Sequence, residues 1–244
     1  MKTTRTPWLW KLELFTFGLS ALAILAFRMQ WLGWRPALLL TAAALAGVVL
    51  TGFSSLLILL AKLRSGKQQG AGRHCLLAFA LSLPVLIGIL LLGMQGAKVP
   101  PIHDITTDPA HPPELVAAAS QRGPGDNSIR YEGTALAEQQ RLAYADIAPI
   151  KSALSTDRAY ARALATARSL GWQIVAEDQA RGSIEAQDRS LIFGFIDDVV
   201  IRVKAEGNGS RIDLRSASRA GAGDLGVNAK RIRKFIQSFN TSKT

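Results

Sequence analysis

The stretch that decides the fold is Val199-Val-Ile-Arg-Val-Lys-Ala-Glu-Gly-Asn-Gly-Ser-Arg-Ile-Asp-Leu-Arg-Ser-Ala217. Apolar and polar residues alternate through most of it, which is the pattern of half-buried strands. Near its middle lies Asn208-Gly209, a dipeptide typical of two-residue hairpin turns. We therefore predict strands over Val199–Ala205 and Arg211–Ala217, joined as an antiparallel hairpin with Asn208 and Gly209 as the loop.

One pair of side chains in that register stands out. Apolar and oppositely charged residues match along the rest of the hairpin, but Arg202 faces Arg215. Like charges directly opposite each other are unfavourable unless an anionic group lies between them. Two kinds of group stay open at this point: a carboxylate of the chain itself, such as Glu185 or Asp197, or an anionic ligand.

The rest of the C-terminal region follows the same kind of pattern. The run Leu191–Ile196 is apolar throughout and predicts a strand that is buried on both faces. Together the elements predict an α+β domain over residues 136–244, with two flanking helices on a mostly antiparallel sheet. The other predicted elements are a helix over Ser155–Leu170, strands over Trp172–Glu177 and Ser183–Asp188, and a helix over Leu225–Phe239.

Residues 1–98 predict three transmembrane helices. Ten of the 29 lysines and arginines lie there against a single acid, Glu13. A span needs about 20 mostly apolar residues. Three runs meet this need: Trp8–Phe27, the 26 uncharged residues between Arg35 and Lys62, and the 23 between His74 and Lys98. The lipid bilayer is thus the first predicted partner.

The basic residues that flank these runs predict the orientation. Seven fall on the side of the N-terminus and the second loop, and three fall on the other side. Bases are enriched on the cytoplasmic side, so the N-terminus is predicted in the cytoplasm and residues 99–244 in the periplasm, with the spans in the inner membrane. The seven are Lys2, Arg5, Lys11, Lys62, Arg64, Lys67 and Arg73; the three are Arg28, Arg35 and Lys98.

Composition separates the two halves further. Residues 99–135 are rich in proline and predict a linker that leads to the domain or wraps around it. Residues 99–244 hold 19 bases and 17 acids, a near balance that argues against a nucleic-acid partner. The single cysteine, Cys75, excludes an intramolecular disulfide framework. Nothing in the chain predicts a cofactor.

The end of the hairpin and the start of the last helix predict an anion site. Arginines supply charge, serines and an asparagine supply hydrogen bonds, and a helix N-terminus favours an anion. The alternative is a scaffold in which carboxylates pair with these arginines. The predicted ligand-binding residues are Arg202, Arg215, Ser216, Ser218, Arg219, Asn228 and Arg231, with Asp197, Asp198 and Asp224 as orienting carboxylates.

Catalytic and metal-binding signals are weaker. His103 and Glu185 are the candidates for a general base. His103, Asp104 and Asp108 are the candidates for a metal site, although short polar residues before proline are also ordinary turn formers. We expect no metal, and the pattern favours a binding protein over an enzyme.

Several separate motifs resemble the domain-of-unknown-function family 1499, over about residues 99–240. The resemblance implies no activity, because the family is uncharacterised, and no catalytic residues carry over. The matching stretches are Ile102–Pro109, Tyr144–Pro149, Ile184–Ala186, Phe195–Val203, Ile212–Gly221 and Asp224–Ile232.

Three functions stay open from the sequence. The first is an inner-membrane protein whose periplasmic domain binds an anionic ligand or an envelope partner through the arginine-rich site. The second is an envelope hydrolase that acts on lipid or cell-wall material. The third is a structural module that docks onto another membrane protein, which predicts an exposed apolar patch.

Overall fold

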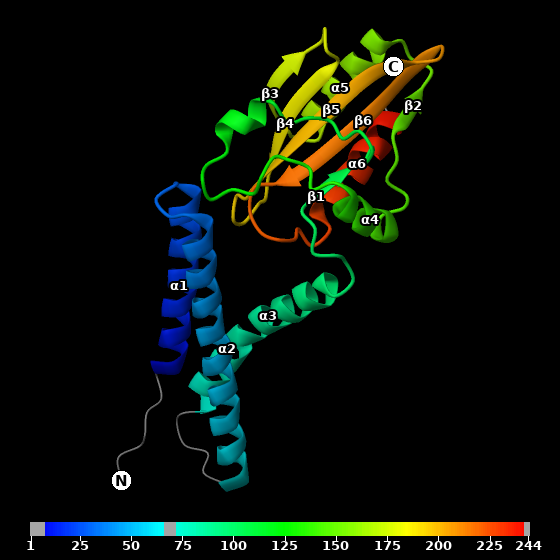
Figure 1. The fold of residues 1–244 in the computed structure, drawn as a ribbon. Helices are drawn as coiled ribbons and strands as arrows, with labels where there is room; N and C mark the ends of the chain where they lie inside the picture. The colour runs from blue at the N-terminus through cyan, green and yellow to red at the C-terminus, as the bar shows by residue number, and fades with distance from the viewer. Residues whose placement is uncertain (1–7, 66–71, 242–244) are drawn as a thin grey trace. The chain divides into compact units, whose positions relative to one another are not determined.

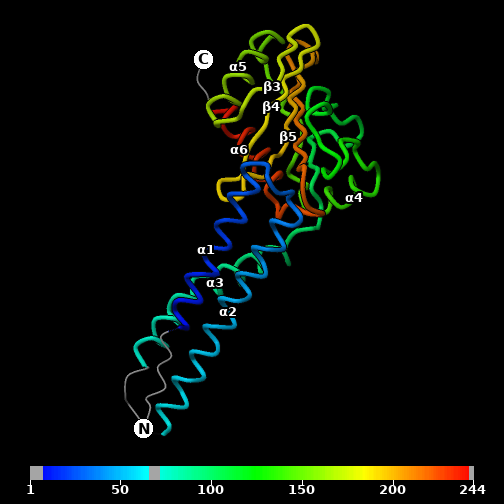
Figure 2. Tube along the Cα trace, turned by 90° about the vertical axis from the view of Figure 1, so that its left-hand side faces the viewer, coloured from blue at the N-terminus to red at the C-terminus, as the bar shows by residue number. Residues whose placement is uncertain are grey.

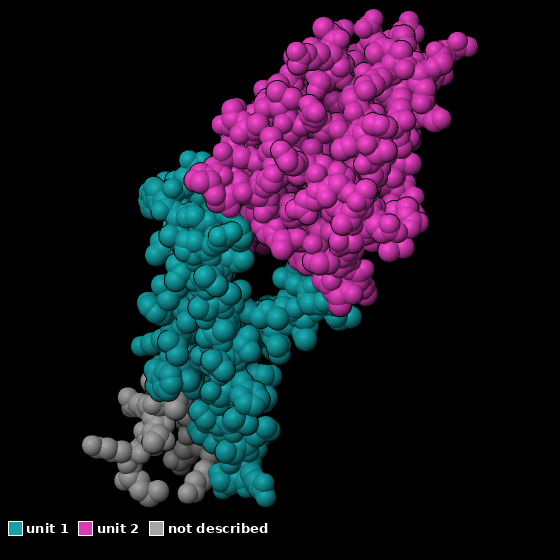
Figure 3. Space-filling model, in the orientation of Figure 1, with its two compact units in different colours: residues 1–95 teal, residues 96–244 magenta. Residues whose placement is uncertain are grey.

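The computed structural model describes residues 8–65 and 72–241 of the chain. They fall into two compact units, Met1–Gln95 and Gly96–Thr244 (Figure 3). Long apolar helices make up the first unit, and an antiparallel sheet with helices makes up the second (Figure 1). The predicted fold class, a helical membrane region followed by an α+β domain, is confirmed.

The first unit contains, among its described residues, three helices that are long and apolar enough to cross a membrane. They are α1 (Trp8–Arg28), α2 (Trp34–Ser65) and α3 (Gly72–Gly96), with mean hydropathies of 1.6, 2.3 and 2.8. The helices α1 and α2 lie side by side (Figures 1 and 2). Each helix covers one of the three apolar runs in the sequence.

Glu13, the acid of the helical unit, is fully buried. Its carboxylate oxygens make no hydrogen bond to the described residues. Glu13 lies beside Gly52 of α2, where an added Cβ would collide with the Oγ of Ser82 on α3. The missing side chain at Gly52 therefore lets the three helices approach one another around Glu13.

The second unit is built on one antiparallel sheet. Its strands are ordered β1-β6-β5-β4-β3, and β2 also pairs with β6. Because β5 occupies the other edge of β6, β1 and β2 follow each other along the same edge. The strands are β1 (Asp104–Thr106), β2 (Ile150–Ser152), β3 (Gln173–Asp178), β4 (Ser183–Arg189), β5 (Ile196–Glu206) and β6 (Gly209–Ser218).

Helices cover one face of this sheet. The helices α5 (Thr156–Ser169) and α6 (Val227–Thr241) lie on the same side of the strands (Figures 1 and 2). Apolar side chains of α6 pack into the core, where Phe235 stacks on Trp172 with ring centroids 5.5 Å apart. Both helices match the predicted ones to within two residues at each end.

A helix that the sequence pattern did not predict closes the edge of β1. This helix is α4 (Thr134–Ala143). The buried Gln140 accepts a hydrogen bond from the backbone N–H of Thr106 and donates one to its carbonyl, at 2.9 and 2.6 Å. The side-chain amide thus takes the place of a neighbouring strand and leaves this edge paired.

The hairpin register differs from the predicted one by two residues. Glu206 pairs with Gly209, so the loop residues are Gly207 and Asn208. Gly207 has φ +56°, and glycine in the first loop position is the mark of a type II′ turn, which competes with the predicted Asn-Gly turn. A shift by two keeps every side chain on its face of the sheet but changes its partner.

This shift removes the predicted like-charge pair. Arg202 pairs with Asp213, and Arg215 lies opposite Val200. The prediction that Arg202 faces Arg215 is therefore wrong, and the clash that pointed to an anion between them does not exist. The one like-charge pair in the observed register, Lys204 with Arg211, lies near the turn.

The predicted strand over Leu191–Ile196 is also wrong. Residues 190–195 form a tight loop between β4 and β5, closed by a backbone hydrogen bond from Ser190 N–H to the carbonyl of Phe195 (2.9 Å). The side chain of Leu191 is 92% exposed and that of Ile192 is 68% exposed. The loop follows because β4 and β5 pair directly, which leaves no place for a strand between them.

Candidate functional site

The sheet face opposite α5 and α6 is crossed by residues 108–131, here called the strap. Figures 1 and 2 show this segment in green on the side of the sheet away from the helices. The strap contains the 3-10 helix Ala117–Gln121 and lies inside the predicted proline-rich linker. Beneath it, the sheet presents charged side chains, and these decide the chemistry of this face.

Arg215 lies under the middle of the strap and is 3% exposed. Its guanidinium binds both carboxylate oxygens of Asp104, with a shortest distance of 2.7 Å. It also donates to the strap carbonyls of Pro113 and Ile129. The ring of Tyr131 lies under the guanidinium, 5.6 Å from centroid to Cζ. Arg215 therefore joins β1, β6 and two points of the strap.

Two further arginines share one buried carboxylate. Asp198 is fully buried and accepts from Arg219 at 2.7 Å and from Arg122 of the strap at 2.8 Å. Arg219 also donates to the carbonyl of Gln121, and Arg122 donates to that of Asn127. Asp198 thus pairs with one guanidinium directly after β6 and with one on the strap, and it holds the two segments together.

Arg202 holds the start of the strap. It binds Asp213 at 2.7 Å and Asp108 at 3.1 Å, and it donates to the carbonyl of His111 at 2.9 Å. Arg211 binds the same two carboxylates. Among the described residues, the hydrogen bonds of Arg202 are donated by its Nε and Nη2, and its side chain is 17% exposed and lines a cavity, so Nη1 is the part of this guanidinium left for a ligand.

Glu185 caps the 3-10 helix of the strap. Its Oε1 accepts from the backbone N–H groups of Val116 and Ala117, and its Oε2 accepts from that of Ala118, at 2.8–3.0 Å. Both oxygens therefore accept hydrogen bonds from backbone N–H groups that have no partner within the helix, because they lie at its N-terminus. The geometry gives Glu185 a structural role and does not support it as a general base.

The other predicted anion-binding residues lie on the helix-covered face. Arg231 of α6 binds Asp197 at 2.6 Å and Asp188 at 2.8 Å, and it donates to Asn228 and Ser216. Asn228 in turn donates to Ser218 at 2.8 Å. This network is closed by the chain's own carboxylates, and it is separated by the sheet from Arg202, Arg215 and Arg219.

Asp224 occupies the N-terminus of α6, where the anion was predicted. Its carboxylate accepts from the backbone N–H groups of Gly226 and Asn228 at 2.8 and 2.6 Å. Burial raises the pKa of Asp224, and these two hydrogen bonds act against that rise. Because a carboxylate of the chain caps the helix, this terminus offers no position for a further anion.

The weak metal and catalytic candidates are not brought together. Asp104 and Asp108 are bound to different arginines. His103 has a buried Nδ1 with no hydrogen-bond partner among the described residues, and its contacts to Ser218 and Asn228 are made by its backbone carbonyl. Within the described ranges, no three His, Cys, Asp or Glu residues are grouped so that they could hold a metal.

A cavity of about 900 Å³ lies between the strap and the sheet. Four arginines and one glutamate are among its charged lining residues, and Tyr131 and several aliphatic side chains line it as well. Burial and the charge of Asp104 raise the pKa of Tyr131 to about 12, so its phenol is neutral at physiological pH. The charged lining residues are Arg130, Arg181, Arg202, Arg215 and Glu114.

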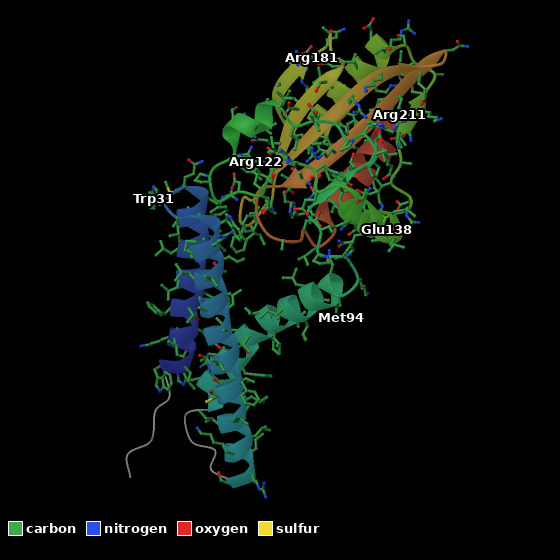
Figure 4. All side chains as sticks on the ribbon, in the orientation of Figure 1. Trp31, Met94, Arg122, Glu138, Arg181 and Arg211 are labelled. Atoms are coloured by element: carbon green, nitrogen blue, oxygen red, sulfur yellow. The ribbon has the colours of Figure 1, made fainter. Side chains whose placement is uncertain are left out.

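The cavity combines predicted and unpredicted residues. Arg202 and Arg215 were predicted as ligand residues, whereas Arg130 and Arg181 were not. Arg181 lies in the turn that joins β3 to β4 (Figure 4). Its ion pair with Asp178 in this turn is long, at 3.5 Å, and exposed to solvent. Arg130 lies in the proline-rich segment. No local sequence pattern marks either residue, because the fold of the strap alone brings them to the same opening.

Comparison with known families confirms the resemblance seen in the sequence. A family model described as "Protein of unknown function (DUF1499)" matches residues 104–239. The chain belongs to this family. No match was found among curated proteins. The matched range of this DUF1499 protein covers β1, the strap, the residues that line the cavity, α5 and most of α6.

Proposed function

We propose that this DUF1499 protein is an integral protein of the bacterial inner membrane whose periplasmic domain binds a small anion with an apolar portion. The cavity under the strap carries the proposal. Its volume of about 900 Å³ is within the range of ligand sites. Its lining joins arginines with aliphatic side chains such as Leu115 and Val200.

The two kinds of arginine in the cavity have different tasks. Arg202 and Arg215 are held by carboxylates and strap carbonyls, so their positions are set before a ligand binds. Arg130 and Arg181 are exposed and line the opening. A carboxylate or phosphate group would be held between them and the open Nη1 of Arg202, with its apolar portion against Leu115 and Val200.

The binding test uses the full chain in detergent and two anions, inorganic phosphate and decyl phosphate. We expect decyl phosphate to raise the unfolding temperature, because a ligand at 100 times its dissociation constant stabilises a fold by about 2.7 kcal/mol. The double variant R130A/R181A should lose most of this gain, since both substituted residues line the opening.

The control for that test is Arg141→Ala. Arg141 is exposed, pairs with Glu138 on α4, and is not among the residues that line the cavity. Its response to decyl phosphate should equal that of the wild type. The proposal fails if neither anion shifts the transition, or if R130A/R181A responds as strongly as R141A. A response to inorganic phosphate alone would contradict the apolar part of the proposal.

The orientation is tested separately. Reporter fusions after Gly70 and after Thr244 should lie on opposite sides of the membrane, with the first in the cytoplasm. Lys2, Arg5 and Lys67, three of the seven bases on which this orientation depends, lie outside the described residues. Alkaline phosphatase activity at Thr244 and its absence at Gly70 is the expected result. The same side for both positions would overturn the three-span topology.

A further inference from the structure

Two adjacent aliphatic side chains stand out on the surface of the domain. Leu191 and Ile192 are 92% and 68% exposed, next to the exposed Arg189. They lie on a loop with defined geometry. Gly194 N–H donates to the carbonyl of Ser190, the Oγ of Ser190 accepts from Phe195 N–H, and the ring of Phe195 stacks on Phe193 at 5.0 Å.

This loop lies at the end of the sheet where the chain arrives from α3. The carbonyl of Ile196, the first residue of β5, accepts a hydrogen bond from the N–H of Arg219, which directly follows β6. Ser218 N–H in turn donates to the carbonyl of His103, just before β1. Figures 1 and 2 agree: the loop between β4 and β5 and the segment before β1 share one end of the sheet, and the β5–β6 turn lies at the other.

The chain between α3 and the sheet is short. Helix α3 ends at Gly96. Ile102 is already buried in the domain, at 4% exposed, and its carbonyl accepts a hydrogen bond from Asp224 N–H. Even a fully extended chain between these two points spans only about 20 Å. With α3 as a membrane span, as proposed above, the length of this connecting chain limits how far this end of the domain can lie from the lipid headgroups on whichever side α3 emerges.

We propose that the loop 190–195 docks on the bilayer, with Leu191 and Ile192 inserted among the headgroups and acyl-chain ends. A tight loop that keeps two adjacent aliphatic side chains exposed has little entropy to lose on insertion. Arg189 lies beside them and matches anionic headgroups in charge. The covalent tether supplies a high effective concentration of membrane, so that a small apolar tip is sufficient for docking.

The test places a fluorescent label on single cysteines in the full chain, reconstituted in bilayers of phosphatidylethanolamine and phosphatidylglycerol. Cys75, the only cysteine, is replaced by serine as background. Leu191→Cys and Ile192→Cys probe the loop. Asn208→Cys is the matched control, because it lies at the opposite end of the 11-residue strand β5, about 35 Å away.

A lipid-borne quencher should quench the labels at 191 and 192 several-fold more than the label at 208. Aqueous iodide should do the reverse. A loop as accessible to iodide as position 208, with no quenching from lipid, would overturn the proposal. Protection from both quenchers would also overturn it, because that result means that a protein surface covers the loop instead of lipid.

A final variant separates insertion from simple proximity. The pair L191D/I192D is combined with a label at Arg189→Cys, which is exposed in the fold. Charged side chains cannot enter the apolar layer without cost, so iodide quenching at 189 should rise to the level of position 208. Unchanged protection at 189 would show that the two aliphatic side chains do not hold the loop at the bilayer.

Discussion

Asp198→Asn is expected to lower the free energy of unfolding of the soluble domain by about 3–5 kcal/mol. Asp198 is fully buried and accepts from Arg219 and from Arg122 of the strap. The asparagine side chain has the same shape as the aspartate side chain but carries no charge. It leaves two guanidiniums, 9% and 5% exposed, without a counter-ion, and their burial is then uncompensated.

Hydrogen exchange of the β5 and β6 amides in the full chain measures this change. Exchange through domain unfolding should accelerate by about a hundredfold to a few thousandfold. Asp146→Asn is the matched control, since Asp146 makes the same kind of pair with Arg233 but is 57% exposed. An exposed pair contributes about 0–1 kcal/mol. Equal effects of both variants would contradict the assigned role of Asp198.

The second large effect is expected at the pair of Asp104 and Arg215. Both side chains are 3% exposed, and removal of either partner should cost about 3–5 kcal/mol. Asp104→Asn leaves the contacts of Arg215 with the strap carbonyls in place. Arg215→Met removes them as well, so the carbonyls of Pro113 and Ile129 lose a donor.

A double-mutant cycle of D104N and R215M distinguishes the pair from the strap contacts. The double variant should be less destabilised than the sum of the single variants, by about 1–3 kcal/mol, because neither charge is then left alone. Exchange in the strap should rise in R215M more than in D104N. Additive effects, or equal exchange in the strap, would show that Arg215 does not hold this segment to the sheet.

The buried partners of Asp198 and Asp104 explain why the arginine-rich sequence pattern is compatible both with an anion site and with a charge-paired scaffold. A run of arginines and serines in a strand shows that charge is concentrated there, but not what neutralises it. The structure supplies internal carboxylates for Arg215, Arg219 and Arg231, which is the scaffold alternative. Arg202 also has carboxylate partners and yet keeps an open Nη1, so only this part of the predicted set still points to a ligand.

The hairpin register and the loop at 190–195 differ from the sequence-based predictions for specific physical reasons. Gly207-Asn208 and Asn208-Gly209 are both good hairpin loops, and side-chain matching did not separate registers that differ by two residues. The apolar run at Leu191–Ile196 predicts a buried strand because burial is the usual state of such runs. The direct pairing of β4 with β5 instead places it in a loop, where Leu191 and Ile192 are exposed.

Local pattern by itself determined the three apolar helices, the antiparallel hairpin, the two flanking helices and the α+β class, because periodicity and turn chemistry act within about ten residues of each other. Only the tertiary structure decided how the strap lies and what each buried charge binds. Asp104 and Arg215 are 111 residues apart in the chain, and Arg122 and Asp198 are 76 apart. A charged side chain accepts any opposite charge that the fold brings within reach, so its partner is set by long-range packing and not by its neighbours in sequence.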